Sequence, residues 1–160
     1  MKIASIKVKV PENANIVIGQ THFVKSVEDI FEAMVTSVPK AQFGISFAEA
    51  SGPCLLRHDG NDQSLEKIAV DICREIGAGH TFVLLMRDAY PINVLNRLKE
   101  IQEVCSIFCA TSNPLEVIVA QTELGRGILG IIDGNSPKGV EDDKAKEERI
   151  DFLRKIGYKR

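Results

Sequence analysis

The sequence of 160 residues contains no apolar run that approaches the roughly 18 residues needed to cross a bilayer. It also lacks an excess of either charge, since 20 basic and 22 acidic side chains leave a formal net charge of −2. A broad positive field that could hold a phosphate backbone is therefore missing, and we expect no binding to membranes or nucleic acids. The N-terminal stretch MKIASIKVKV alternates Lys with apolar residues and lacks the pattern of a signal peptide, so we expect a cytoplasmic protein.

Signatures of metal and nucleotide binding are also scarce. The four cysteines form no CxxC pair, no Cys/His cluster has zinc spacing, and we expect no metal site. There is no GxxxxGK[ST] phosphate loop. Residues 125–130 (GRGILG) match GxGxxG, but an apolar strand follows where a dinucleotide fingerprint needs a helix. This favours a tight hairpin, with Arg126 at its tip as a residue that could still meet an anion.

The apolar periodicity of the chain predicts alternating strands and helices. Strands are predicted at residues 3–9, 16–19, 43–47, 55–56, 81–86, 106–110, 115–120 and 128–132. Helices are predicted after the N-caps Ser26 and Ser64, from Pro91, and from Glu141 onward. Strands and helices interleave in the first two thirds and strands cluster later. We therefore expect an α/β fold, with α+β as the other option, in one compact domain over residues 1–160 that has a mixed β-sheet flanked by helices.

Several predicted strands run into compact polar turns, where open α/β sheets usually bind ligands. The polar residues of these turns are His22, Glu49, Ser51, Arg87, Asp88, Asn93, Thr111 and Asn113. Polar turns are also what any α/β protein needs to reverse its chain. Each residue is therefore a candidate, and whether they meet in one pocket stays open at the level of sequence.

Two histidines have a setting suited to chemistry. His22 lies between an apolar strand and a helix start, and imidazole can pass protons or accept a phosphoryl group near neutral pH. His80 follows residues 77–79 (GAG), whose glycines let the backbone approach a ligand. The alternatives are a hydrogen-bonded structural histidine at 22 and a residue that leads into a buried strand at 80. His58 lies in a polar turn and is expected on the surface.

Charged groups at strand ends supply further candidates. Glu49 could accept hydrogen bonds from sugar hydroxyls or act as a base, unless it is a solvated loop charge. Arg87 and Asp88 are adjacent at the end of the most apolar strand. Arginine can hold a phosphate or carboxylate with two parallel donors, and a structural ion pair is the alternative.

Long segments of the chain resemble one known family. They are VIGQTHFVKSVEDIFEAMV, FGISFAEASGP, GAGHTFVLLMRDAYPINVLN, IFCATSNPLEVIVA, GRGILGIIDGNSPKGVE and LRKIGYK. Together they are similar to the archaeal and bacterial adenosine-specific kinases, from about Lys2 to Lys159. The resemblance implies a compact α/β protein that assembles as a homotrimer, binds adenosine or AMP, and has a histidine that can carry phosphate.

The first hypothesis is therefore an adenosine kinase in which His22 is the phosphoryl carrier, because its strand-to-helix position gives it exposure and amide donors. Glu49 or Asp88 would orient or deprotonate the ribose hydroxyl. Ligand-binding roles are expected for the remaining candidates, which are His80, Ser51, Arg87, Asn93, Thr111, Asn113 and Arg126. No ATP-binding motif is recognised, so the phosphoryl donor and a role for Mg²⁺ stay open. The alternatives are a nucleotide-binding or sensing module without turnover, and an oligomeric structural protein.

Overall fold

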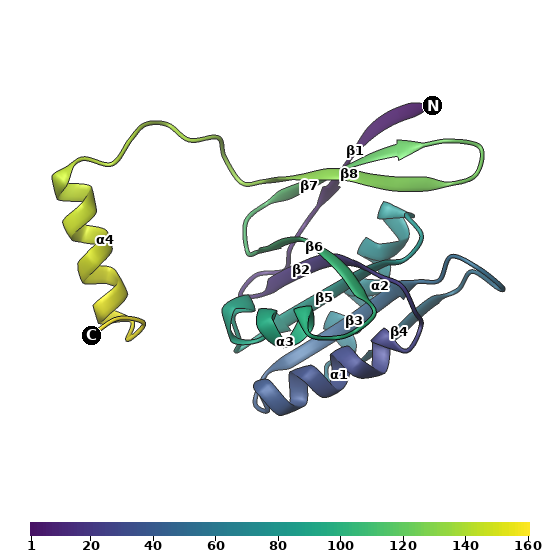
Figure 1. The fold of residues 1–160 in the computed structure, drawn as a ribbon, viewed down its shortest axis with the longest axis horizontal. Coiled ribbons are helices and arrows are strands. Elements are labelled where there is room, and N and C mark those ends of the chain that lie inside the picture. Colours follow the sequence, from purple (N-terminus) through teal and green to yellow (C-terminus); the bar gives the residue numbers. More distant parts are fainter.

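The eight strands of the chain form two antiparallel sheets (Figure 1). The five-stranded sheet has the order β4-β3-β5-β2-β6, and the three-stranded sheet has the order β1-β7-β8. The strands are β1 (Lys2–Val8), β2 (Asn15–Thr21), β3 (Gln42–Ala48), β4 (Leu56–Gly60), β5 (Thr81–Arg87), β6 (Val104–Thr111), β7 (Leu115–Gln121) and β8 (Arg126–Asp133). The computed structural model describes all 160 residues.

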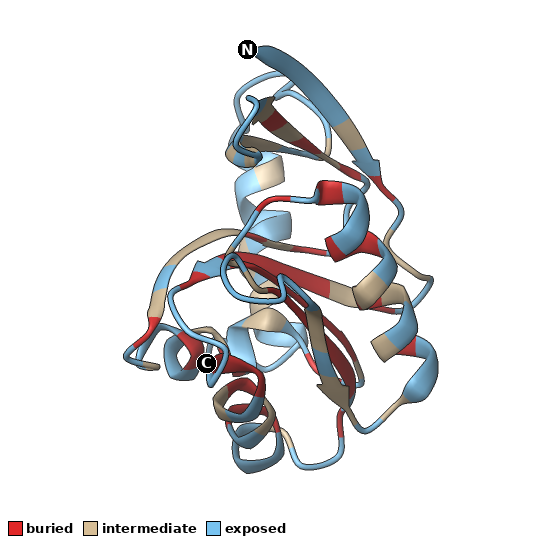
Figure 2. Cartoon of the chain, turned by 90° about the vertical axis from the view of Figure 1, so that its right-hand side faces the viewer, coloured by how far each residue is buried: buried red, intermediate tan, exposed pale blue.

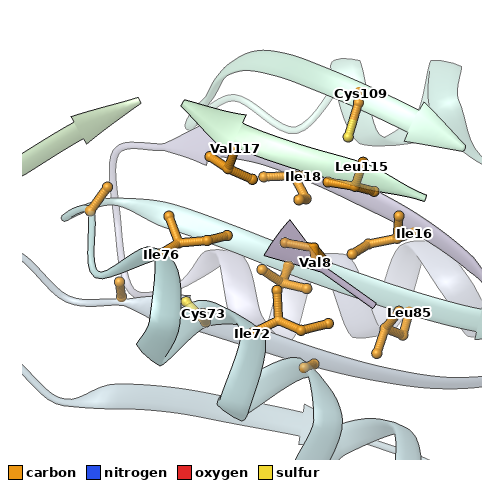
Figure 3. Close-up of a cluster of buried hydrophobic side chains, with 14 of the residues drawn as sticks. Val8, Ile16, Ile18, Ile72, Cys73, Ile76, Leu85, Cys109, Leu115 and Val117 are labelled. Atoms are coloured by element: carbon orange, nitrogen blue, oxygen red, sulfur yellow. The ribbon is translucent and has the colours of Figure 1, made fainter. Parts of the chain in front are cut away.

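Helices cover both faces of the five-stranded sheet. They are α1 (Ser26–Ser37) and α3 (Leu95–Lys99) on one face and α2 (Gln63–Ile76) on the other, with a short 3-10 helix η1 (Pro91–Asn93) before α3. A fourth helix, α4 (Asp143–Lys155), covers neither face. One core cluster joins α1 and α3 to one face of this sheet. The second core cluster joins α2 and the three-stranded sheet to the other face. Figure 3 shows this second cluster, which contains Ile72 and Ile76 of α2, Val8 of β1 and Val117 of β7. None of the helices is long and apolar enough to cross a membrane.

The central strand β5 shows why the sequence folds in this way. Residues 81–86 are all buried, because both faces of the strand are covered. Figure 2 shows the same concentration of burial in the middle strands of the sheet. The continuous apolar run at residues 81–86 predicts a strand that is covered on both faces, and that prediction is confirmed.

The α/β class and the compact domain are also confirmed, but the sheets are antiparallel and not mixed. Helix α1 connects β2 to β3, and α2 connects β4 to β5; the register shows that each of these pairs runs in the same direction. However, β5 is inserted between β2 and β3, and β3 is inserted between β4 and β5. The two strand–helix–strand units are therefore split, and every neighbouring pair becomes antiparallel.

Three local predictions need correction. Helix α2 is capped by Asp62, whose side chain accepts a hydrogen bond from the Leu65 amide at 2.9 Å, and not by Ser64. Ser26 does not cap α1 either, because its hydroxyl is buried and bonds to other side chains. Strand β4 continues through His58, where a turn was predicted, because the ladder with β3 supplies backbone partners up to Gly60.

Helix α4 stands away from the rest of the protein. Residues 134–142 form an extended connection that leaves β8, and Figure 1 shows α4, in yellow, beyond the edge of both sheets. No residue of α4 is buried. The predicted C-terminal helix is confirmed, but it does not join the core of its own chain.

Candidate functional site

The antiparallel register sorts the candidate residues between two opposite ends of the five-stranded sheet. At one end β2 and β3 finish while β5 and β6 begin; we call this the His22 end. At the other end β5 and β6 finish while β2 begins; we call this the Asp88 end. The strands between the ends have seven or eight residues, so the ends lie about 20 Å apart.

Five candidates belong to each end. The His22 end has His22, Glu49, Ser51, His80 and, through the chain that follows α2, Arg126. The Asp88 end has Arg87, Asp88, Asn93, Thr111 and Asn113. One shared site would require all ten candidate residues to lie in one pocket. Within a single chain they lie at two opposite ends of the sheet, five at each end. The reason is that consecutive strands run in opposite directions, so turns that follow strands alternate between the ends.

The two histidines of the His22 end come together from distant parts of the sequence. Their ring centroids are 6.4 Å apart and the rings are perpendicular. The His22 amide donates to the Glu103 carbonyl at 2.8 Å, and the Thr21 amide donates to the His80 carbonyl at 2.9 Å. His22 is exposed, as the sequence led us to expect, and its backbone is fixed by these bonds.

Two phenylalanines extend the pair of imidazoles into an aromatic row. The His80 ring stacks on Phe47, with centroids 5.8 Å apart and an interplanar angle of 21°. The His22 ring lies 6.2 Å from that of Phe23, which is exposed. Neither phenylalanine was identified from the sequence, although Phe23 is adjacent to His22. Phe47 is buried and supports the His80 ring from below, whereas His22 and Phe23 are exposed, and exposed aromatic faces suit a planar heterocyclic ligand.

His80 has an unusual backbone. Its φ is 62°, in the left-handed region that residues other than glycine rarely adopt. The amide of His80 donates to the Ala48 carbonyl at 2.7 Å, which joins the start of β5 to the end of β3. Asp88, at the other end of β5, also has a positive φ of 56°. Backbone strain of this kind tends to occur at functional positions, and both residues are candidates.

Glu49 follows Ala48, and its carboxylate accepts hydrogen bonds from two neighbouring groups. Its carboxylate accepts from the Leu55 amide at 3.1 Å, and both of its oxygens lie 3.2 Å from a guanidinium nitrogen of Arg57. Ser51 is exposed in the turn that follows. Arg57 was not identified from the sequence, because only the β3–β4 pairing brings it beside Glu49.

A buried polar cluster lies beneath His22. The hydroxyls of Thr21 and Ser26 are hydrogen-bonded to each other, and both residues are fully buried. Thr21 Oγ1 donates to the Glu103 carbonyl at 3.1 Å, and Ser26 Oγ donates to Glu103 Oε1 at 3.2 Å. Glu103 is itself buried, with Lys25 Nζ 3.8 Å from its carboxylate. The cluster therefore ties the turn that bears His22 to the start of β6.

The Arg126 side chain has mainly a structural role, because most of its hydrogen bonds go to the end of α2. Its Nη1 donates to the carbonyls of Glu75 and Ile76 at 3.0 and 3.3 Å, which satisfies the C-terminal end of α2. It also lines a cavity of about 180 Å³ together with Gln20 and Gly79. The hairpin expected for residues 125–130 is confirmed, since β7 and β8 pair and the Thr122 amide donates to the Gly125 carbonyl.

The Asp88 end contains a separate polar network. Asp133 Oδ1 accepts from Thr111 Oγ1 at 2.8 Å and from Asn113 Nδ2 at 3.0 Å. Asn93 Oδ1 accepts from the Tyr90 amide at 2.9 Å. These polar side chains therefore hold turns in place. Two cavities open here, of about 1010 and 690 Å³; the smaller is lined by Asp88, and the larger by Thr111 and Asn113.

The cysteines are all free, and two of them are sealed from solvent. Burial raises the pKa of the Cys73 thiol to about 11, and burial also raises the pKa of the Cys109 thiol to about 11. Cys54 and Cys105 are exposed. No group of three or more His, Cys, Asp or Glu side chains is placed to hold a metal ion.

The comparisons with known proteins agree with the resemblance seen in the sequence. The family model described as adenosine specific kinase matches residues 6–159, and the chain belongs to this family. The crystal structure of the PH1918 protein from Pyrococcus horikoshii OT3 has a TM-score of 0.95 and 45% sequence identity. The alignment covers 99% of this chain and 98% of that one. No curated protein sequence matches.

Proposed function

We propose that the protein phosphorylates adenosine by way of a phosphohistidine, and that His22 carries the phosphoryl group. The observation that supports this most is the pairing of His22 with His80 at the end of the sheet, at a centroid distance of 6.4 Å. Membership of the adenosine-specific kinase family supports the substrate. An exposed imidazole on a fixed backbone is a suitable nucleophile, because no rearrangement is needed to present it.

The reaction has two displacement steps. In the first, a ring nitrogen of His22 attacks the terminal phosphorus of a phosphoanhydride donor, the N–P bond forms, and the P–O bond to the leaving group breaks with its electron pair. In the second, a ribose hydroxyl oxygen attacks the same phosphorus, and the N–P bond breaks. The hydroxyl proton passes to Glu49, whose carboxylate accepts hydrogen bonds at the same end of the sheet.

The other residues of the His22 end would bind the nucleoside. His80 and Phe23 offer faces for the adenine ring, and Ser51 offers a hydroxyl for the sugar. Arg126 would lie near transferred phosphate, since it shares a cavity with Gln20 and Gly79, which are close in sequence to the two histidines. The homotrimer that the resemblance implies stays a prediction, and the residues of the Asp88 end have no role in this mechanism.

The three histidines allow a matched experiment. The protein is incubated with ATP labelled on the γ-phosphate, with and without adenosine, and both protein-bound label and AMP are measured. We expect acid-labile, alkali-stable label on the wild type, its loss on addition of adenosine, and neither label nor AMP with His22→Ala. His58→Ala is the control, because His58 is exposed on β4 and pairs with Glu66.

Two outcomes would decide against the proposal. Label and AMP formation at the wild-type level in His22→Ala would remove His22 from the mechanism. Calorimetric binding of adenosine or AMP to the wild type, with no product from ATP or from inorganic polyphosphate as donor, would favour a nucleotide-binding module without turnover.

A further inference from the structure

Arg57 of β4 lies beside the aromatic row of the His22 end. In the β3–β4 ladder it is directly paired with Phe47, and directly paired residues point to the same face of a sheet. Phe47 is also the ring on which His80 stacks, and His80 precedes β5, the other neighbour of β3. Arg57 and His80 therefore reach Phe47 from the two strands on either side of it.

Glu49 is fixed against the same row. Its neighbour Ala48 accepts a hydrogen bond from the His80 amide at 2.7 Å. Its other neighbour, Ala50, packs against Gly79, where an added Cβ would lie 2.8 Å from the Ala50 Cβ. The turn that carries Glu49 therefore contacts the segment that carries His80. The Glu49 side chain is 17% exposed, so part of it stays open to a ligand.

The hydrogen bonds of Glu49 leave one position on its carboxylate free. An ionised carboxylate can accept about four hydrogen bonds, roughly two at each oxygen. Oε2 accepts from the Leu55 amide at 3.1 Å and from Arg57 Nη2 at 3.2 Å. Oε1 accepts only from Arg57 Nη2, also at 3.2 Å. Oε1 therefore keeps a position for a further donor, while the bond from Arg57 to both oxygens fixes the orientation of the carboxylate.

Folding alone does not explain the placement of Arg57. Its Nε is sealed from solvent and has no hydrogen-bond partner. A buried donor without a partner lowers stability, and such groups are rare in folded proteins. The ion pair with Glu49 adds little in return, because the Arg57 side chain is partly exposed. An arrangement that lowers stability and fixes a carboxylate beside a candidate site indicates a functional role.

We propose that Arg57 is a positioning residue, which holds Glu49 so that Oε1 accepts a hydrogen bond from one ribose hydroxyl of the nucleoside. The inference rests on the proposed function, because it takes adenosine as the ligand. A carboxylate suits a sugar hydroxyl, since hydrogen bonds to a charged acceptor are stronger than those to a neutral one. In the second displacement the same oxygen takes the hydroxyl proton. Arg57 itself acts through Glu49 and does not contact the nucleoside.

Calorimetry measures the hydroxyl contact without any need for turnover. The ligands are adenosine and its three monodeoxy analogues, one for each ribose hydroxyl. We expect the wild type to bind one analogue about 10- to 100-fold more weakly than adenosine, because that analogue leaves a charged acceptor unpaired. Arg57→Met keeps the unbranched stem and removes every donor, so it should bind adenosine and that analogue alike. Glu49→Ala should show the same loss of preference.

Further variants separate positioning from a general effect on the fold. If Arg57 acts through Glu49, adding Arg57→Met to Glu49→Ala should leave the affinity for adenosine unchanged. Arg57→Lys should keep part of the preference, since a single nitrogen makes both bonds to Glu49. Arg74→Met is the matched control, because Arg74 lies on α2 and pairs with Asp71 at 2.6 Å. Circular dichroism checks folding, and Arg57→Gln, with the same expected loss, replaces Arg57→Met if that variant does not fold.

Three outcomes would overturn the inference. They are a wild type that binds the four nucleosides alike or not at all, a full preference in Arg57→Met, and an equal loss of affinity for every nucleoside in that variant. The labelling of His22 tests the proposed function separately. A hydroxyl preference that depends on Arg57, in a protein that forms no AMP, would leave this inference standing and would reject the kinase.

Discussion

The carbonyl of His80 accepts a hydrogen bond from the amide of Thr21, the residue before His22, at 2.9 Å. The two imidazoles are therefore held in position by the main chain as well as by their own ring contact. This relationship joins two segments that are almost 60 residues apart in the sequence, and it holds both rings at the same end of the sheet.

Substitution of His80 by Asn tests its role in binding. Asn tolerates the left-handed backbone at this position, so the free energy of unfolding should change little. The loss of a stacking ring should raise the KM for adenosine about tenfold, since one base–aromatic contact contributes roughly 1–3 kcal/mol. Steady-state kinetics checks this. An unchanged KM would remove His80 from the nucleoside site, whereas a change in kcat alone would assign it a part in the chemistry.

Removal of the Ser26 hydroxyl should destabilise the protein. Ser26→Ala leaves the buried Glu103 carboxylate without one donor, and a buried acceptor without its partner costs about 1–3 kcal/mol. Urea denaturation measures the free energy of unfolding. Ser37→Ala, at the exposed end of α1, is the control, with an expected change within about 0.5 kcal/mol. Equal effects of the two substitutions would show that the polar cluster contributes no stability.

The N-cap of α2 gives a prediction that depends on pH. The hydrogen bond from the Leu65 amide holds the pKa of the Asp62 carboxyl below its ordinary value of 3.8. Because the folded pKa is the lower one, this contribution to stability is fully present above pH 3.8 and is lost as the pH falls through the folded pKa. Asp62→Ala should therefore cost about 1 kcal/mol at pH 7, and less below pH 3.

Denaturation of wild type, Asp62→Ala and Ser64→Ala at both pH values checks this assignment. Ser64→Ala should have the smaller effect at pH 7, because Asp62 is the residue that caps the helix. A larger effect of Ser64→Ala would return the cap to the residue that the sequence indicated.

Gly44 is required for close packing between β3 and α2. A Cβ at this position would overlap the backbone of Leu65 and Glu66. Gly44→Ala should lower the free energy of unfolding by about 1–3 kcal/mol through overpacking. Gly130→Ala on β8 is the matched control, since a Cβ there meets no atom within 4 Å, and its effect should stay within about 0.5 kcal/mol. A thermal or urea melt in which both variants match the wild type would mean that α2 can move away from the sheet.

Much of the local structure followed from the sequence because its causes are local. The apolar run of residues 81–86, the helical spacing of residues 65–76 and the hairpin at residues 125–130 each depend on side chains that are close in the chain. The helix N-caps were less predictable. Ser and Asp are both common N-cap residues, so Ser26, Ser64 and Asp62 are equal candidates until the hydrogen-bond partners of their side chains are known. Family membership also followed from the sequence, since the resemblance covers nearly the whole chain.

Only the tertiary structure decided how the candidate residues are grouped. Strand order and direction depend on pairing between distant segments, and the insertion of β5 between β2 and β3 made the sheet antiparallel. This sent Asp88 and Arg87 to the end opposite His22, and it brought His80, Phe47 and Arg57 to the same end as His22 and Glu49. The free position of α4 is not visible in the sequence either, because an amphipathic pattern predicts that a helix packs through one face but does not say where that face lies in the tertiary structure.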